Sequence, residues 1–414
     1  MNFFDELKWR DMVKDCSDLE LAEKRLNSKQ KLTFYTGYDP TGESLTVGHL
    51  VQVARMRLMQ KHGFDAICLI GGATGLIGDP REVGERKLLS LEKSLENADK
   101  IKNQLSKLLD PKKTIFVNNN EWLSKISLIE FLRDYGKNFN INYMLAKDII
   151  NRRLDEGISY TEFSYMLLQS IDFLYLYENY NCELQFGGSD QWGNLTAGLE
   201  LIRKVKGDNS AFALSSPLLL KSDGKKFGKS EGGALWLDEN LTSPYELYQY
   251  FLNTPDEDVV KNLKVLTLLE VEEIVKLEKK AKECPEERQA QKVLAYEVVK
   301  FVHGEKKANQ AIKITNALFN SSFDDLDKEE WQEVAKILKS PKVGENENIL
   351  DCLVNLGLAQ SKREAREFVN SKAIIIGNNK VEDINTLISK DMLYFGKYLV
   401  VKRGKKKIAV AILG

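Results

Sequence analysis

The chain has 414 residues, of which 43% are hydrophobic, so it is long enough for two or three domains. Its 60 Lys and Arg balance 61 Asp and Glu, and the net charge of −1 excludes an overall basic, nucleic-acid-binding character. The charge is uneven, however, because residues 346–414 hold 12 Lys and Arg against 7 Asp and Glu, which leaves −6 for the rest. A basic end on an acidic body is typical of a nucleic-acid-binding appendage, and a solvated basic face is an equally good explanation of the charge alone.

The cysteines and histidines indicate neither disulfide bonds nor a bound metal ion. Five scattered cysteines without a CxxC pair, and three histidines without HExxH, indicate neither a disulfide framework nor a metal held by the protein. The start, Met-Asn-Phe-Phe-Asp-Glu-Leu-Lys-Trp, is amphipathic and lacks a signal-peptide core. No run approaches the ~18 apolar residues of a membrane span. We therefore expect a cytoplasmic protein without a membrane segment.

The first elements in chain order predict a parallel sheet. After a helix pair within 1–30, strand 32–38, helix 47–61 and strand 66–70 form a βαβ unit with a right-handed crossover. The second strand runs into Gly71-Gly-Ala-Thr-Gly-Leu-Ile-Gly-Asp79, which is neither GxGxxG nor a P-loop. We expect this loop to bring backbone close to a ligand at the carboxyl edge of the sheet.

Helices dominate the rest of the chain. Charged helices are predicted at about 85–110 and 123–137, and an apolar helix at about 160–180. The sheet is expected to end near Leu220, residues 244–318 to be all-helical, and 321–345 to be a linker around one short helix. A small α+β unit closes the chain, with a helix at 361–370 and strands at 373–376 and 398–401.

The apolar helix at 160–180 carries a polar stripe. Tyr165, Gln169 and Asp172 recur at i, i+4 and i+7 on one face. A solvated face is the usual explanation, but an otherwise apolar helix should be buried, and buried polar groups need partners. An Asp that accepts from a phenol, with Tyr and Gln orienting an ammonium, would recognise tyrosine. Tyr35 would reach the phenol from the other side, and Asp79 would hold the α-ammonium.

Two further motifs suit a nucleotide. The segment from Thr41 through Thr46 and Gly48 to His49 opens a helix whose N–H groups face an anion, and its hydroxyls and imidazole are donors for phosphate. The segment Lys226-Phe-Gly-Lys229-Ser230 puts two ammonium groups on a glycine-softened loop, which suits a pyrophosphate leaving group. Taken singly, His49 is more commonly explained as an ordinary helix-capping or core residue. The 226–230 segment is more commonly explained as a run of surface charges.

Together these two motifs resemble the HIGH and KMSKS signatures of class I aminoacyl-tRNA synthetases. Five stretches, 35–41, 71–80, 163–169, 185–194 and 226–230, closely resemble those of bacterial tyrosyl-tRNA synthetases, and the resemblance runs from Met1 to the basic end. Two places depart from the family pattern. Thr46 replaces the first HIGH histidine, and the segment 81–86 is shorter and more acidic and lacks the lysine expected before Arg86.

The resemblance implies activation of tyrosine by ATP with Mg²⁺, transfer to tRNA(Tyr), a homodimer, and no protein-held metal. It implies that Gly188 and Asp190 hold the ribose, that Leu218 lies beneath the adenine, and that Arg86 grips pyrophosphate. It also implies that Gln191 orients the substrate carboxylate and that Gln185 lines the tyrosine pocket. The residues expected to bind ATP are Gly37, Asp39, Gly48, Gly188, Asp190, Leu218 and Lys229, and those expected to act in catalysis are Thr41, Thr46, His49, Arg86, Lys226, Lys229 and Ser230.

The implied fold class is α/β. A Rossmann-like catalytic domain with a helical connective insertion spans 1–225, and the lysine-motif loop with a helical anticodon-side domain spans 226–320. A linker (321–345) precedes a small α+β RNA-binding domain (346–414), similar to a fold of ribosomal small-subunit proteins and pseudouridine synthases. Its expected RNA-binding residues are Lys362, Arg363, Arg366, Arg403, Lys405, Lys406 and Lys407.

Two other functions remain open at this point. One is a synthetase-like chain that binds structured RNA, as in intron splicing. The other is a tryptophanyl-tRNA synthetase, which shares the fold. The pair of Tyr35 and Asp172 favours a phenol over an indole.

Overall fold

The computed structural model describes most of the chain, as two compact units, Met1–Ala308 and Asn309–Gly414. The described residues are 1–28, 30–80, 89–155, 157–207, 210–222, 224, 227–230, 233–320, 322–377, 379–404 and 407–414, without the side chains of residues 148, 149, 229 and 230. Among them, no helix is both long and apolar enough to cross a lipid bilayer.

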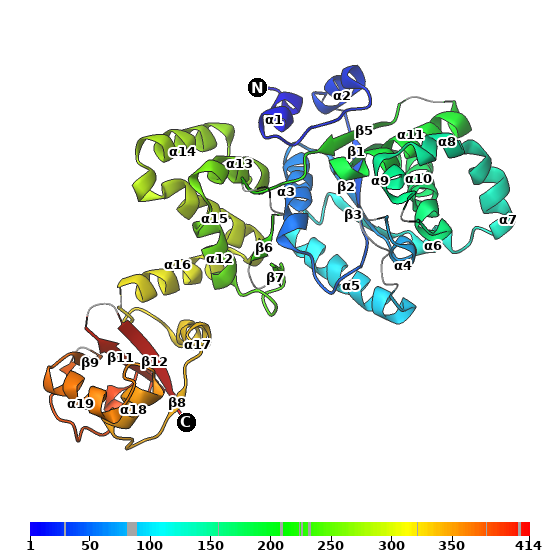
Figure 1. The fold of residues 1–414 in the computed structure, drawn as a ribbon. Coiled ribbons are helices and arrows are strands. Elements are labelled where there is room, and N and C mark those ends of the chain that lie inside the picture. Colours follow the sequence, from blue (N-terminus) through cyan, green and yellow to red (C-terminus); the bar gives the residue numbers. More distant parts are fainter. Residues whose placement is uncertain are drawn as a thin grey trace. The chain divides into compact units, whose positions relative to one another are not determined.

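A parallel sheet forms the centre of the first unit (Figure 1). Its strands are β1 (Thr33–Tyr38), β2 (Asp65–Ile70), β3 (Thr114–Asn118), β4 (Cys182–Gly188) and β5 (Phe212–Ser216), in the order β3-β2-β1-β4-β5. All four strand pairs are parallel, and the central strands are buried on both faces, as their apolar runs require. The order reverses between β1 and β4, which places a ligand crevice at the carboxyl ends of these two strands.

Helices flank this sheet. They include α3 (Val47–Lys61), α4 (Thr74–Ile77), α5 (Leu91–Leu108), α10 (Tyr160–Tyr180) and α11 (Trp192–Lys206). The buried Arg55 joins α3 to the sheet, because its guanidinium lies 3.6 Å from the centre of the Phe186 ring and donates to Ser216 Oγ at 2.7 Å. Two short helices, α1 (Phe3–Trp9) and α2 (Leu19–Leu26), begin at Asn2 and Asp18, whose side chains accept backbone N–H groups.

The predicted helix at 123–137 is wrong. The segment instead contains α6 (Asn120–Leu123), α7 (Leu128–Glu130), a π turn (Phe131–Tyr135) and a 3₁₀ turn (Gly136–Asn138). The reason is local, because the Ser127 side chain accepts the Glu130 N–H and starts a new helix inside the expected one. Two short helices, α8 (Ile141–Leu145) and α9 (Asp148–Arg153), follow.

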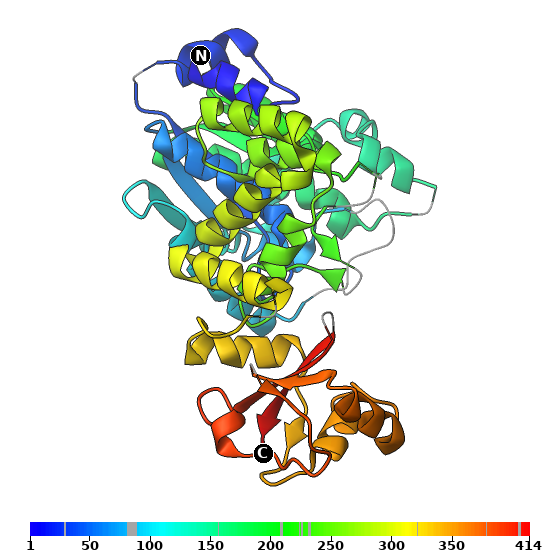
Figure 2. The same ribbon diagram turned by 90° about the vertical axis from the view of Figure 1, so that its left-hand side faces the viewer.

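The stretch after the sheet is helical, as predicted for 244–318. It contains α12 (Pro244–Leu252), α13 (Asp256–Leu266), α14 (Val271–Glu283), a 3₁₀ turn (Pro285–Glu287), α15 (Gln289–His303) and α16 (Glu305–Asn320). Helix α15 packs against α12, α13 and α14, and α13 packs against α3. Figure 2 shows α12 to α15 in front of the sheet.

The second unit has its own sheet, in the order β10-β9-β11-β12-β8. Its elements are α17 (Lys328–Ile337), β8 (Lys342–Val343), α18 (Ile349–Asn355), α19 (Lys362–Asn370), β9 (Ile374–Ile376), β10 (Asn379–Lys380), a 3₁₀ turn (Lys390–Met392), β11 (Tyr398–Arg403) and β12 (Lys407–Leu413). The segment 321–345, expected as a linker, differs from that expectation, because β8 pairs with β12 and the buried Trp331 stacks on Tyr398. The fold class predicted from the sequence is confirmed.

Candidate active site

A buried carboxylate lies below the carboxyl edge of the first sheet. Asp172, on α10, is 2% exposed and accepts from Trp122 Nε1 at 2.8 Å and from Asn119 Nδ2 at 2.9 Å. Burial raises the pKa of Asp172 to about 8, against the effect of those two hydrogen bonds, which lower it. The group is therefore poised between its charged and neutral forms near neutral pH.

Among the buried polar atoms that lack a hydrogen-bond partner in the described part of the chain, three oxygens lie on β1, β4 and α10. They are Tyr35 Oη, Gln169 Oε1 and Gln185 Oε1. Tyr35 and Gln185 are register partners on β1 and β4, and Gln169 and Asp172 share one face of α10. Burial and the neighbouring Asp172 carboxyl raise the pKa of Tyr35 well above its usual value, so its hydroxyl stays protonated. Unpartnered buried polar atoms are destabilising, and a bound polar ligand would satisfy them.

Asp79 is joined to the start of α11. Its carboxylate accepts from Gln191 Nε2 at 2.7 Å and from Asn194 Nδ2 at 3.2 Å. Two residues expected at the tyrosine site, Asp79 and Gln191, are thus brought together from segments that lie 112 positions apart. A carboxylate and an amide side by side suit an ammonium and a carboxylate on the same substrate.

Tyr165 contacts the nucleotide side of the crevice in this structure. Its hydroxyl donates to Asp39 Oδ2 at 2.8 Å, and Asp39 Oδ1 accepts from Thr74 Oγ1 at 2.7 Å. Asp39 therefore lies between the residues expected to bind tyrosine and those expected to bind ATP. Thr41 follows it, and its N–H donates to the Asp39 carbonyl at 2.8 Å.

The first nucleotide motif forms the N-terminus of α3. Thr46 is its N-cap, and the Thr46 N–H donates to His49 Nδ1 at 3.1 Å. Since Nδ1 accepts this bond, the neutral ring carries its proton on Nε2 and keeps one donor for a ligand. Gly48 and His49 are exposed, so the helix end is open to an incoming anion.

The second motif lies against the first. A Cβ added at Gly228, whose φ is +77°, would lie 3.1 Å from Gly48 N. The Leu235 N–H donates to the Gly228 carbonyl at 3.0 Å, and the Val47 N–H donates to the Leu235 carbonyl at 2.9 Å. A short hairpin of β6 (Lys229–Ser230) and β7 (Gly233–Ala234) completes the loop. Lys226 and Arg86 lie outside the described residues, and so do the side chains of Lys229 and Ser230.

Residues expected around the ribose and adenine cluster at the ends of β4 and β5. A Cβ at Gly188 would lie 2.5 Å from Asp190 Oδ1 and 3.4 Å from Leu218 Cδ2. Leu218 is 52% exposed, which leaves an open apolar surface for a planar ring. Gly37 is exposed within β1. Among the described residues, no group of three or more His, Cys, Asp or Glu is placed to hold a metal.

The basic residues of the second unit divide into two kinds. Lys362, Arg363 and Arg366 are exposed on α19; Lys362 pairs with Asp351 at 2.6 Å at the surface, and Arg363 pairs loosely with Glu367 at 3.6 Å. Arg403, by contrast, donates to the Leu358 carbonyl and lies over the Phe368 ring. Lys407 is exposed, and Lys405 and Lys406 lie outside the described residues. Arg403 is therefore committed to the fold more than the α19 cations are.

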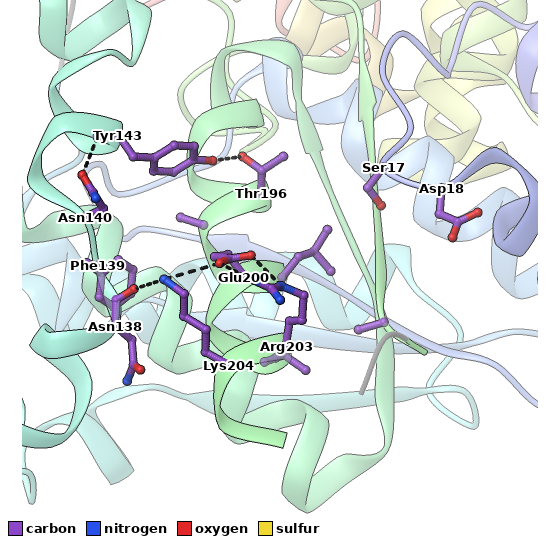
Figure 3. Close-up of a pocket in the computed structure, with 14 residues that line it drawn as sticks. Ser17, Asp18, Asn138, Phe139, Asn140, Tyr143, Thr196, Glu200, Arg203 and Lys204 are labelled. Carbon is purple, nitrogen blue, oxygen red and sulfur yellow. Dashed lines mark hydrogen bonds and ion pairs between the residues drawn. The ribbon is translucent and has the colours of Figure 1, made fainter. Parts of the chain in front are cut away.

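A separate cavity of about 790 Å³ opens on α11 (Figure 3). Its polar lining is largely paired internally, since Lys204 donates to the Asn138 carbonyl, Arg203 pairs with Glu200, and the Tyr143 and Thr196 hydroxyls lie 3.1 Å apart. It shares none of the residues expected to bind tyrosine or ATP.

Four site residues escaped the sequence analysis: Thr74, Asn119, Trp122 and Asn194. A usable signal existed for two of them, because Asn119 and Trp122 follow β3 directly, at the carboxyl edge where ligands bind in open α/β sheets. Asn194 lies in one of the family stretches, 185–194, but nothing in its spacing marked it as a partner of Asp79.

Two family models match the chain over most of its length. Residues 27–320 match the family of class I tRNA synthetases for W and Y, and residues 330–411 match the C-terminal domain of SYY-like tyrosine–tRNA ligases. The chain is 49% identical over 413 residues to the tyrosine–tRNA ligase of Aster yellows witches'-broom phytoplasma and 51% identical over 419 residues to that of Phytoplasma australiense, with all of each chain covered.

A similar fold occurs among solved structures. The C-terminally truncated mitochondrial tyrosyl-tRNA synthetase of Aspergillus nidulans superposes with a TM-score of 0.68 at 31% identity. The match covers 77% of this chain and 94% of that one. The sheet and its flanking helices therefore follow an arrangement seen in an experimental structure.

Proposed function

The chain belongs to the class I tRNA synthetase family, among the tyrosine–tRNA ligases, and we propose that the crevice between β1 and β4 is where it joins tyrosine to ATP. The reaction forms tyrosyl-adenylate and pyrophosphate, and the tyrosyl group then passes to the 3′ end of tRNA(Tyr). The observation that supports this site best is the buried Asp172 beside three buried oxygens without partners, Tyr35 Oη, Gln169 Oε1 and Gln185 Oε1, in the described chain.

Recognition of tyrosine follows from these groups. The substrate phenol donates to Asp172, and the Tyr35 hydroxyl lies on the other side of it. Phenylalanine would leave these buried groups unpaired, and such sites reject an analogue that lacks the hydroxyl strongly. Asp79 and Gln169 hold the α-ammonium, with Tyr165 nearby, while Gln191 orients the carboxylate and Gln185 lines the pocket.

ATP, with its Mg²⁺, is the second substrate. Its phosphates meet the N-terminus of α3, where Thr41, Thr46 and His49 supply donors and Gly48 leaves room. Gly188 and Asp190 hold the ribose, Leu218 supports the adenine, and Gly37 and Asp39 complete the nucleotide side. Lys226, Lys229, Ser230 and Arg86 bring the donors and positive charge for the departing pyrophosphate.

The chemistry needs no covalent enzyme intermediate. A carboxylate oxygen of tyrosine attacks the α-phosphorus of ATP, the bond from that phosphorus to the bridging oxygen breaks, and pyrophosphate leaves with the electron pair. The α3 terminus and the lysine loop, which lie against each other, stabilise the charge that develops on the leaving group. Orientation of the two substrates supplies the rest of the rate enhancement.

The assay that tests this function is tyrosine-dependent exchange of pyrophosphate into ATP, measured with each amino acid alone. Tyrosine alone should drive exchange, and exchange driven by tryptophan would contradict the proposal. Asp172→Ala should lower the tyrosine-dependent rate by more than ~100-fold, because Trp122, Asn119 and the phenol lose their acceptor. Glu178→Gln, near the far end of the same helix, is the control and should keep the wild-type rate.

A homodimer is the expected assembly. Large apolar side chains are exposed along residues 128–160, and Leu128, at 70%, is the most open of them. The set is Leu128, Ile129, Leu132, Ile141, Tyr143, Leu154 and Tyr160. Such a concentration of exposed apolar surface is typical of a protein–protein interface. Because the proposed reaction charges tRNA, we propose that the protein acts in the cytoplasm.

The dimer is tested by sedimentation. The wild type should sediment at twice the chain mass of 47.2 kDa. A double variant, Ile129→Glu with Leu132→Glu, should sediment as a monomer at micromolar concentration. Val275→Glu, which changes an exposed apolar residue of α14, should leave the dimer intact. A monomeric wild type would contradict the expected homodimer, but it would not contradict the reaction proposed for a single chain.

A further inference from the structure

A chain of hydrogen bonds runs through buried side chains from the tyrosine side of the crevice to the nucleotide side. Asn119 Nδ2 donates to Asp172 Oδ2 at 2.9 Å and to Thr74 Oγ1 at 2.9 Å. Thr74 Oγ1 donates in turn to Asp39 Oδ1 at 2.7 Å. The two carboxylates at its ends, Asp172 and Asp39, are therefore connected by only two side chains.

The donors of Asn119 and Thr74 in this hydrogen-bond network are assigned. Asn119 Oδ1 accepts the Ala73 N–H at 2.9 Å, which fixes the amide so that both Nδ2 hydrogens point to Thr74 and Asp172. The single hydroxyl hydrogen of Thr74 goes to Asp39, because its oxygen accepts from Asn119. Thr74 and Asn119 are buried, so the two bonds that Asn119 donates are shielded from solvent, while the bond from Thr74 to Asp39 is partly buried. In such a network a change at one end alters the bonds at the other.

The glycine loop makes room for this chain. A Cβ at Gly71 would lie 2.0 Å from Asp39 Oδ1 and 2.4 Å from Thr74 Oγ1. Only glycine at this position lets the bond between Thr74 and Asp39 form. At least one glycine of the 71–79 motif thus serves contacts within the protein, in addition to any approach by a ligand.

We propose that Thr74 is a positioning residue that couples the two substrates: tyrosine bound at Asp172 fixes Asp39 for ATP through Asn119 and Thr74, and each substrate tightens the binding of the other. The proposal rests on the function proposed above. When the phenol gives Asp172 a third donor, the carboxylate takes one position, and the bonds through Asn119 and Thr74 hold Asp39 in one position too. Coupling between two sites is reciprocal, so the effect must be equal in both directions.

The test uses full-length enzyme and two variants of one side chain. Thr74→Val keeps the shape but removes the hydroxyl, and Thr74→Ser keeps the hydroxyl as a matched control. The dissociation constant of an ATP analogue with a methylene bridge between the α- and β-phosphorus is measured with and without saturating tyrosine. The reciprocal measurement uses tyrosine with and without the analogue.

In the wild type and in Thr74→Ser, tyrosine should tighten analogue binding by about tenfold, within the usual range of such couplings. In Thr74→Val the factor should fall to less than about twofold. Full coupling in Thr74→Val, or none in the wild type, would overturn the proposal. Thr74→Ala serves as the second hydroxyl-free variant if Thr74→Val does not fold. Wild-type enzyme that fails to bind tyrosine would instead refute the proposed function.

Discussion

Asp172 combines burial with two donors, and this combination has a consequence for binding. In the empty site burial holds the pKa of Asp172 at about 8, so most of the carboxyl is protonated at pH 7. A phenol that donates to it adds a third hydrogen bond to the charged form and lowers that pKa. Binding of tyrosine must therefore release a proton between the two pKa values.

The expected result is that tyrosine affinity falls as the pH falls below about 8, by at most about tenfold per unit. Calorimetry of tyrosine binding at pH 7, in buffers of different ionisation enthalpy, should show release of close to one proton. Asp172→Asn carries no titrating carboxyl and should release none by this route. An unchanged proton balance between wild type and variant would show that Asp172 is already charged in the empty site.

Part of this site was predictable from sequence, and part was not. The sequence predicts the polar stripe of Tyr165, Gln169 and Asp172 as a binding site, because three polar residues on one face of an apolar helix need partners. Thr74 gives no such signal, and the only signal for Asn119 is its place directly after β3. Their partners lie 35 and 53 positions away along the chain, and only the packing of α10 and α4 against the sheet edge brings them together.

At the scale of elements, strong periodic segments behaved as predicted, and weak ones did not. The helix expected at 160–180 is α10, whose apolar length leaves no alternative. Residues 123–137 have apolar spacing suited to one helix, but Ser127 caps a new start and divides it. Likewise, Lys342–Val343 is too short to be recognised as a strand until β12 offers an edge.

The short helix α1 links two parts of the first unit. Arg10, which directly follows it, is 1% exposed and pairs with Glu6 at 2.7 Å. Its guanidinium also donates to the carbonyls of Lys264, in the last turn of α13, and of Thr267 and Leu269, between α13 and α14. Glu6 in turn contacts His62 at the end of α3, and this hydrogen bond, more than Arg10, lowers the pKa of Glu6 to about 2. The helical stretch is thus tied to α3 through a few buried charges.

Arg10→Ala should destabilise the first unit by about 3–5 kcal/mol, because it leaves a half-buried carboxylate and several carbonyls without their donor. Urea unfolding followed by circular dichroism measures the loss. Arg203→Ala, which removes an exposed arginine paired with Glu200 on α11, is the control and should change stability by less than about 1 kcal/mol. Similar losses in the two variants would mean that the ties of Arg10 to the helical stretch are weak.

At the scale of the whole molecule, the charge asymmetry seen in the sequence has a structural location. The excess positive charge of residues 346–414 includes three exposed cations on α19, Lys362, Arg363 and Arg366, while Arg403 is held within the fold. Composition alone shows that residues 346–414 carry a net positive charge. It did not reveal which cations are exposed, because that depends on interactions such as the hydrogen bond between Arg403 and the Leu358 carbonyl.

We therefore expect changes in the second unit to affect the transfer of tyrosine to tRNA and not the activation of tyrosine by ATP. A triple variant that changes Lys362, Arg363 and Arg366 to Gln removes three candidate partners of tRNA phosphates on α19. It should leave tyrosine-dependent pyrophosphate exchange unchanged, because that chemistry lies in the first unit. It should raise the KM for tRNA in aminoacylation by about tenfold or more at moderate salt. The log–log slope of tRNA binding against salt should become shallower by about one unit for each cation that had neutralised a phosphate.

The matched control changes Lys372, Lys380 and Lys390 to Gln, three exposed cations of the same unit that lie outside α19. It removes the same charge, so a general electrostatic attraction would raise the KM equally in both triple variants. A larger effect of the α19 variant is expected if that helix lies on the phosphate backbone of the tRNA. Equal effects would show that the second unit attracts tRNA only through its overall positive charge. A fall in pyrophosphate exchange would show that the α19 changes also impair the first unit.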